Sequence, residues 1–108
     1  MSDATLRELT EEMHRFVAGK GWYEPGSPRP QTPRNLAISL AIEAAEVLEH
    51  FQWRDEPRDS AELASELADV ALYLLQLADV SGIDLAGAIR AKLALNAGRI
   101  WDAEEPQS

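Results

Sequence analysis

Two helical segments between residues 36 and 80 constrain this chain most, because acidic residues interrupt their apolar stripes. One face of the first segment has the i, i+4, i+7, i+11, i+15 spacing of a helix and carries Leu36, Leu40, Glu43, Val47 and Phe51. Glu43 therefore occupies a position where an apolar side chain is expected, and Glu46 lies one turn further along, beside it. The pattern predicts a helix whose packed face carries charge.

The second segment repeats this arrangement. Its apolar stripe consists of Leu63, Leu67, Val70, Leu74 and Leu77. Glu66 and Asp69 flank the stripe, and residues three apart are neighbours on a helix surface. Each segment thus presents two carboxylates side by side, and antiparallel packing of the two helices could bring all four together.

Four carboxylates at a partly buried site need protons or a cation. Two like charges about 4 Å apart repel by roughly 1 kcal/mol in water and by about 4 kcal/mol at an effective dielectric constant near 20. The chain has no cysteine, and the motifs contain no histidine, so the predicted ligands of such a cation are all carboxylate oxygens. Oxygen ligands favour a hard divalent ion, Mg²⁺ or Mn²⁺.

Length and composition indicate a single soluble domain, residues 1–108, with 45% hydrophobic and 27% charged residues. The first residues include acids and no apolar stretch, so we expect no signal peptide. The most apolar run, residues 70–75, is far shorter than a membrane span. We expect a cytoplasmic protein without a membrane partner. A net charge of −9 argues against binding a nucleic-acid polymer.

The remaining pattern predicts an all-α fold, a four-helix bundle-like arrangement without strands. The first helix is expected from about Asp3 to Ala18 with Ser2 or Asp3 as its cap, and the second from Pro33 to Phe51 or Trp53. The third should begin after Asp59, end before Gly82 and be the most buried element. The fourth is expected from Leu85 to about Ile100, and residues 102–108 should form a frayed tail.

The fourth helix carries a second group of polar residues on one face. Lys92, Asn96 and Arg99 stand at i, i+4 and i+7. Two cations and an amide in this register suit an anionic ligand such as a polyphosphate. Together with the carboxylates, they suggest metal-assisted chemistry at a phosphate.

The order of these motifs resembles a known family. Glu43-x-x-Glu46, Glu66-x-x-Asp69 and Lys92-x-x-x-Asn96-x-x-Arg99 are similar to the MazG-related all-α nucleotide pyrophosphohydrolases, and most of all to their dCTP pyrophosphatase branch. The segments Pro33-Arg34-Asn35-Leu36 and Phe51-Gln52-Trp53 also stand where that branch has such segments. The resemblance covers most of the chain, from Trp22 to Trp101.

The resemblance implies a Mg²⁺-dependent enzyme that splits a nucleoside triphosphate, with dCTP or a modified dCTP as candidates, into monophosphate and pyrophosphate. Such an enzyme serves in house-cleaning of the nucleotide pool, and members of the family form homodimers or homotetramers made from dimers. By the family's pattern, Mg²⁺ would be held by Glu43, Glu46, Glu66 and Asp69. The phosphates would be held by Lys92, Asn96 and Arg99, and the ligand would be bordered by Asn35 and Tyr73. The aromatics that sandwich the base would be Trp22 and Trp53.

Some positions depart from the family's pattern. Gln31 stands where the dCTP branch has His, Ser65 precedes Glu66 where many members have an acid, and Ile100 replaces an aromatic residue. The proline-rich approach, residues 25–33, is also long. These departures bear on base specificity more than on the reaction.

Two other classes of protein stay open at this point. A carboxylate-bridged di-iron bundle needs two Glu-x-x-His motifs on different helices, and only Glu11-x-x-His14 is present. A non-catalytic helical interaction or regulatory module would keep the fold but bind no metal. His14 and His50 are expected to be ordinary surface or helix-end residues.

Overall fold

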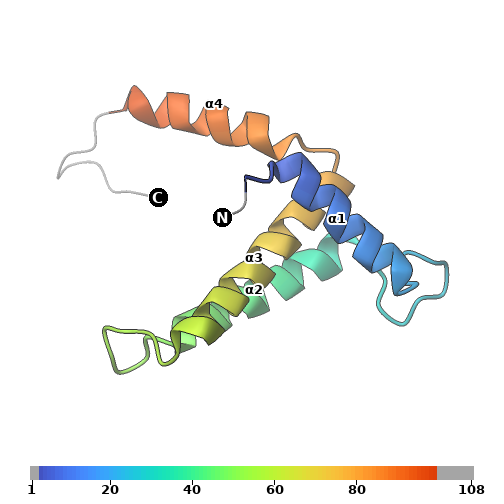
Figure 1. The fold of residues 1–108 in the computed structure, drawn as a ribbon. Helices are drawn as coiled ribbons and strands as arrows, with labels where there is room; N and C mark the ends of the chain where they lie inside the picture. The colour runs from blue at the N-terminus through green and yellow to red at the C-terminus, as the bar shows by residue number, and fades with distance from the viewer. Residues whose placement is uncertain (1–2, 100–108) are drawn as a thin grey trace.

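A computed structural model describes residues 3–99 and shows four α-helices (Figure 1). They are α1 (Leu6–Gly19), α2 (Pro33–Glu49), α3 (Ser60–Val80) and α4 (Leu85–Ala97). No strand occurs within these residues, which confirms the expected all-α class. The fourth helix's expected last residue, Ile100, and the expected frayed tail lie outside the described residues.

Local capping chemistry sets most helix boundaries. The Thr32 hydroxyl accepts from the Asn35 amide at 3.2 Å and Pro33 opens α2, as the sequence predicts. The Asp59 carboxylate accepts from the amides of residues 61 and 62 at the start of α3. At the other end of α3, Gly82 takes the left-handed conformation, φ 73°, which only glycine adopts without strain.

The expected start of the first helix was wrong by three residues. The cap is Thr5, whose hydroxyl accepts from the Glu8 amide at 3.1 Å while the Glu8 carboxylate accepts from the Thr5 amide at 2.8 Å. This reciprocal pair needs a glutamate three residues after the cap, and neither Ser2 nor Asp3 has one there.

Two helices also end earlier than expected. α2 ends at Glu49 with His50 as its cap, and residues 51–53 form a turn in which Trp53 has φ 77°. A positive φ at a bulky residue is incompatible with a continuing right-handed helix. α4 ends at Ala97, and Gly98 caps it.

The helices pack unevenly. α2 and α3 run side by side in opposite directions, and α1 lies across the end where α2 begins and α3 finishes (Figure 1). The buried apolar side chains gather at this crossing: Met13, Val17, Leu36, Leu75 and Ala78. α4 leaves the same end in another direction and packs mainly on α3.

Much of the apolar surface stays open. α3 supplies more buried side chains than any other helix, as expected, yet Leu67, Leu72 and Leu74 on it are about half exposed. Leu48 on α2 is 70% exposed and Leu93 on α4 is 63% exposed. α4 has no buried residue at all among those described. Exposed apolar side chains on this scale are typical of a surface that another molecule covers.

Between residues 3 and 99, no single helix is long and apolar enough to cross a membrane. Only α3 and α4 taken together, across a bend of 102°, have the length and composition for it.

The capping pair at Thr5 predicts a stability difference between neighbouring residues. Thr5→Ala leaves the Glu8 amide without its acceptor and should lower the free energy of unfolding by about 1 kcal/mol. Asp3→Ala, the matched control, should change it by less than about 0.5 kcal/mol. Urea unfolding at one fixed protein concentration measures both, and equal effects would contradict the Thr5 cap.

Candidate active site

Three carboxylates meet where α2 packs on α3. Glu43 and Glu46 project from α2 and Asp69 projects from α3 to meet them. Partial burial, followed by hydrogen bonds and negative charge from Glu46 and Asp69, raises the pKa of Glu43 to about 7. The two helices thus bring together three of the four predicted ligands. We call Glu43, Glu46 and Asp69 the acid cluster.

The fourth carboxylate, Glu66, has a different partner. His50 Nε2 lies 2.6 Å from Glu66 Oε1, and the His50 side chain is completely buried. His50 Nδ1 is also buried and has no hydrogen-bonding partner in the described part of the chain. His50 does end α2, as one of the two expectations had it, but it does not lie on the surface. This contact restricts the orientation of the Glu66 carboxylate.

The acid cluster has the chemistry of a divalent-cation site. Its donors are all carboxylate oxygens, which Mg²⁺ and Mn²⁺ prefer, and the raised pKa of Glu43 reflects its partial burial beside two further carboxylates. As the side chains lie, no three Asp, Glu or His residues between 3 and 99 converge closely enough to hold an ion. The donor set therefore fits a hard divalent cation in its chemistry.

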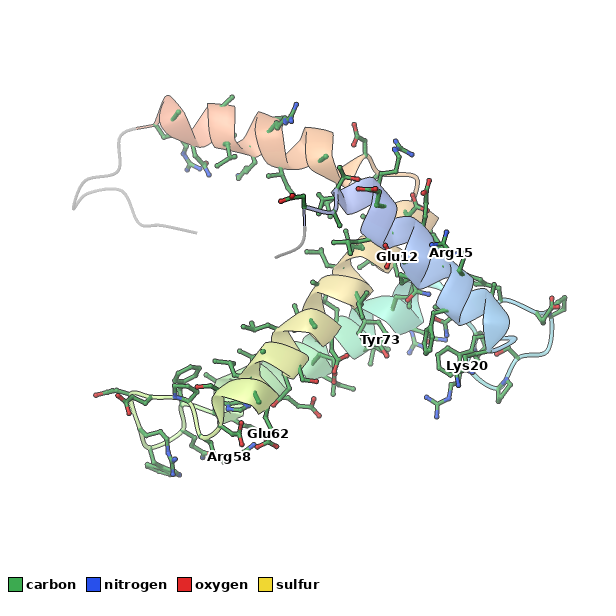
Figure 2. All side chains as sticks on the ribbon, viewed as in Figure 1. Glu12, Arg15, Lys20, Arg58, Glu62 and Tyr73 are labelled. Carbon is green, nitrogen blue, oxygen red and sulfur yellow. The ribbon has the colours of Figure 1, made fainter. Side chains whose placement is uncertain are left out.

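A pocket of about 310 Å³ adjoins the acid cluster. Asp69 is part of its wall, and three predicted ligand-contacting residues also line it: Trp22, Asn35 and Tyr73. Figure 2 shows Tyr73 on α3 where α1 approaches α2 and α3. The volume lies at the lower end of the range found for small-molecule sites.

The loop before α2 builds one side of this pocket. The rings of Trp22 and Phe16 meet edge to face, with 5.9 Å between their centroids. The Arg29 guanidinium carbon lies 5.4 Å from the centroid of the Trp22 ring. Asn35 Nδ2 donates to the carbonyl of Pro30 at 2.9 Å, which ties the loop to the first turn of α2. These contacts hold an aromatic ring against the pocket before any ligand is present.

The other predicted ligand residues lie elsewhere. Trp53 is 92% exposed in the turn between α2 and α3, at the end of the pair opposite α1 (Figure 1). Lys92 and Asn96 belong to α4 and Arg99 follows it, and none of the three lines the pocket. One chain therefore does not assemble the whole predicted set.

Sequence reasoning missed a hydrogen-bonded group of polar residues at the wall of the pocket: His14, Tyr23, Gln31, Gln76 and Asp79. It named Gln31 only as a departure from the family's pattern and His14 only as a surface or helix-end residue. The signal that could have found them is Gln76, a single amide within the apolar run of α3, which is 3% exposed and lines the pocket. His14 does not face the acid cluster, because it bonds to Tyr23 and Asp79 instead. Its placement removes the one Glu-x-x-His motif that a di-iron site would use.

Comparison with known proteins agrees with this geometry. The model of the MazG-like family matches residues 38–106. The chain belongs to the MazG-like family. Bovine (Bos taurus) dCTP pyrophosphatase 1 is 32% identical to it over 107 residues, which cover 91% of this chain and 60% of that protein. The chain thus spans about 60% of the length of this dCTP pyrophosphatase.

Two further relatives of this MazG-like chain are covered more fully. The dATP/dGTP diphosphohydrolase of Cyanophage S-2L is 34% identical over 98 residues, which cover 91% of this chain and 79% of that protein. The crystal structure of a pyrophosphatase from Archaeoglobus fulgidus superposes with a TM-score of 0.72 at 35% identity, covering 89% of this chain and 92% of that one. The family resemblance found in the sequence is confirmed, and so is the helical fold.

The raised pKa of Glu43 predicts a pH dependence of stability. The folded state holds the Glu43 proton up to about pH 7, whereas the unfolded chain releases it near the ordinary pKa of 4.5. The stability that this proton contributes to the folded state is therefore fully present below pH 4.5. It is then lost as the pH rises through about 7. Without metal, the melting temperature of the native protein should fall between about pH 5 and pH 8, relative to that of Glu43→Gln over the same range. Parallel profiles for the two proteins would contradict the crowded acid cluster.

Proposed function

We propose that this MazG-like chain is a Mg²⁺-dependent nucleoside triphosphate pyrophosphohydrolase. It would convert a deoxynucleoside or nucleoside triphosphate into the monophosphate and pyrophosphate, with dCTP or a modified dCTP among its candidate substrates. The observation that carries the proposal is the shared wall: Asp69 belongs both to the acid cluster and to the aromatic pocket. A base in the pocket would place its phosphates near the carboxylates.

The names of the relatives support the same reaction class. Two are called a dCTP pyrophosphatase and a dATP/dGTP diphosphohydrolase, and the crystal structure is of a pyrophosphatase. Since these names differ in the base, they leave the base preference of this chain to its own pocket. We also propose that the protein acts in house-cleaning of the nucleotide pool in the cytoplasm.

Each part of the site has a distinct task. The carboxylates that would hold Mg²⁺ are Glu43, Glu46, Glu66 and Asp69. Bound there, the ion would neutralise charge on the phosphate oxygens and lower the pKa of a bound water. His50 keeps Glu66 oriented through its 2.6 Å contact. Trp22, held by Phe16 and Arg29, offers a flat apolar surface to a base, and Tyr73 and Asn35 border it.

The phosphate-binding residues come, in this proposal, from a second copy of the chain. Lys92 and Asn96 lie on α4 and Arg99 follows it; α4 extends away from the crossing of α1 with α2 and α3 (Figure 1), and none of its residues lines the pocket. The exposed apolar side chains of α4, among them Ile89, Leu93 and Leu95, suit burial against another subunit. A homodimer, or a homotetramer made from dimers, would then complete the site.

Trp53 supports the same assembly. It is 92% exposed and has a φ of 77°, a strained conformation for a large side chain that persists mainly where function requires it. Presented on a turn far from its own chain's pocket, Trp53 would cover the base bound by a partner, opposite Trp22.

The reaction is tested by pyrophosphate release from a panel of dNTPs and NTPs, with Mg²⁺ or with EDTA. We expect Mg²⁺-dependent release with a monophosphate product. Glu46→Gln and Asp69→Asn should each lower kcat by at least about a hundredfold, because each removes a ligand of the ion, while circular dichroism stays unchanged. The matched control is Glu49→Gln, an exposed acid on the same helix, which should keep the native rate.

The opposite outcomes are equally clear. Unchanged rates in both site variants would contradict the metal site. No release from any triphosphate, even at high protein concentration, would favour a non-catalytic interaction or regulatory module.

The shared site is tested by mixing two impaired variants, Glu46→Gln, which should lose turnover, and Lys92→Ala, which should mainly weaken triphosphate binding, at a triphosphate concentration where neither turns over alone. If α4 serves the partner's pocket, a heterodimer of Glu46→Gln and Lys92→Ala subunits has one intact site, formed by the Lys92→Ala subunit's carboxylates and the other subunit's α4. Unfolding and refolding an equal mixture should therefore restore about a quarter of the native rate in a two-fold symmetric dimer. A mixture as inactive as its components would place both groups in one chain.

A further inference from the structure

A chain of hydrogen bonds links the far end of α3 to the wall of the pocket. His14 Nε2 lies 2.7 Å from Asp79 Oδ2, and His14 Nδ1 lies 2.5 Å from the Tyr23 hydroxyl. Gln76 Nε2 lies 3.1 Å from the same hydroxyl and 2.8 Å from Gln31 Oε1. Gln31 Nε2 lies 2.6 Å from the carbonyl oxygen of Arg29. Of these side chains, Gln76 and Gln31 line the pocket.

The carboxylate fixes the direction of the bonds at one end. An ionised carboxylate only accepts, so His14 Nε2 donates to Asp79. In the neutral imidazole Nδ1 is then an acceptor, and the Tyr23 hydroxyl donates to it. Burial raises the pKa of Tyr23, which keeps that hydroxyl protonated near neutral pH. With its hydrogen committed to His14, the Tyr23 oxygen accepts from the Gln76 amide nitrogen.

The backbone fixes the direction at the other end independently. A carbonyl oxygen only accepts, so Gln31 must turn its Nε2 toward Arg29 and its Oε1 toward Gln76. The Gln76 nitrogen therefore faces Gln31 as well as Tyr23. Both ends give Gln76 the same orientation, although an isolated amide could point either way.

This arrangement determines what the two amides can offer a ligand. Both hydrogens of Gln76 Nε2 are used within the chain, so only its carbonyl oxygen remains for the pocket. Gln31 Oε1 is used by Gln76, and one hydrogen of its Nε2 by Arg29, which leaves one N–H. The wall therefore presents one fixed acceptor and one fixed donor.

We propose that Gln76 and Gln31 select nucleotides whose base carries an exocyclic amino group, namely cytosine and adenine, over bases with a carbonyl there. The amino group of cytosine or adenine would donate to Gln76, and the adjacent ring nitrogen would accept from Gln31. Uracil, thymine and guanine present a carbonyl oxygen and a ring N–H, the opposite pattern. The carbonyl oxygen of such a base would face the Gln76 oxygen, so that two acceptors meet, and its ring N–H would face the Gln31 N–H, so that two donors meet. These buried groups would be left without hydrogen bonds.

The position of the pair fits this role. Trp22 lines the same pocket, so a base lying against its ring would have its edge within reach of the wall that carries the two amides. This inference rests on the proposed function, because it names the substrate class for the same site. It assigns no role to His14, Tyr23 and Asp79 beyond setting the direction of the amides.

The test compares bases that differ only along the edge that the two amides would read. Binding of the non-hydrolysable α,β-imido analogues of dCTP and dUTP, which differ in the group at position 4 and in the hydrogen on ring nitrogen 3, is measured by calorimetry on the whole protein with Mg²⁺. Turnover is measured with dCTP against dUTP and with dATP against dITP. We expect the amino base of each pair to be favoured by about tenfold to a hundredfold in Kd and in kcat/KM. Equal values, or a preference for the carbonyl base, would overturn the proposal.

Two variants show whether the amides cause the preference. Gln76→Met and Gln31→Met keep an unbranched side chain but remove the acceptor and the donor, and should bring each ratio to within about threefold of one. Leu72→Met, the control, places a methionine in the same pocket wall without touching either amide, and should keep the native ratio. Native selectivity in both glutamine variants would overturn the assignment.

The binding measurement separates this proposal from the proposed function. Selective binding of the dCTP analogue without turnover of any triphosphate would sink the reaction and leave the base preference standing. Turnover without discrimination between the paired bases would overturn the base preference and leave the reaction standing.

Discussion

Repulsion among carboxylates is the constraint on which the rest of this structure depends. The packing of α2 on α3 holds Glu43, Glu46 and Asp69 together, and partial burial, followed by the two neighbouring carboxylates, raises the pKa of Glu43. Hydrophobic contacts elsewhere in the fold must offset this unfavourable energy. A bound divalent cation would convert the same crowding into affinity, which is why a strained acid cluster beside an aromatic pocket suits metal-assisted phosphate chemistry.

The small amount of buried surface connects the site to assembly. The core is confined to the crossing of α1 with the α2–α3 pair, and α4 leaves its apolar side chains exposed. In our account the same feature serves two purposes, because a partner that covers α4 would also receive its Lys92, Asn96 and Arg99. Trp53, held in the turn at the opposite end of the pair, would be shared in the same way. The catalytic unit would then be the oligomer rather than the chain.

The sequence predicted the features that depend on neighbouring residues, namely helix boundaries and the side chains that share a helix face. Pro33, Asp59 and Gly82 all mark helix boundaries that the structure confirms, because capping involves residues within a few positions. The meeting of Glu43, Glu46 and Asp69 was also predictable, since helical spacing fixes which side chains share a face. Asn35, Trp22 and Tyr73 were placed together by family resemblance rather than by spacing.

The remainder depended on contacts between distant residues. The buried bond from His50 to Glu66 requires α2 to end where it does, and the positive φ of Trp53 that accompanies this end has no simple sequence signal. The chain of bonds through Gln76 depends on the path of residues 20–32 and on the orientation of α1, neither of which periodicity specifies. The direction of α4 follows from the short turn at Gly82 and Ile83, and no pattern within the helix encodes it.

The central claim is that the acid cluster exists to hold a divalent cation. Electron paramagnetic resonance of Mn²⁺ titrated with the nucleotide-free protein tests it most directly, since free Mn²⁺ gives a strong signal that binding broadens. The account predicts saturable loss of the signal with the native protein, restoration by excess Mg²⁺, and little loss with Asp69→Asn. An unchanged signal with the native protein, or equal binding by the variant, would contradict it.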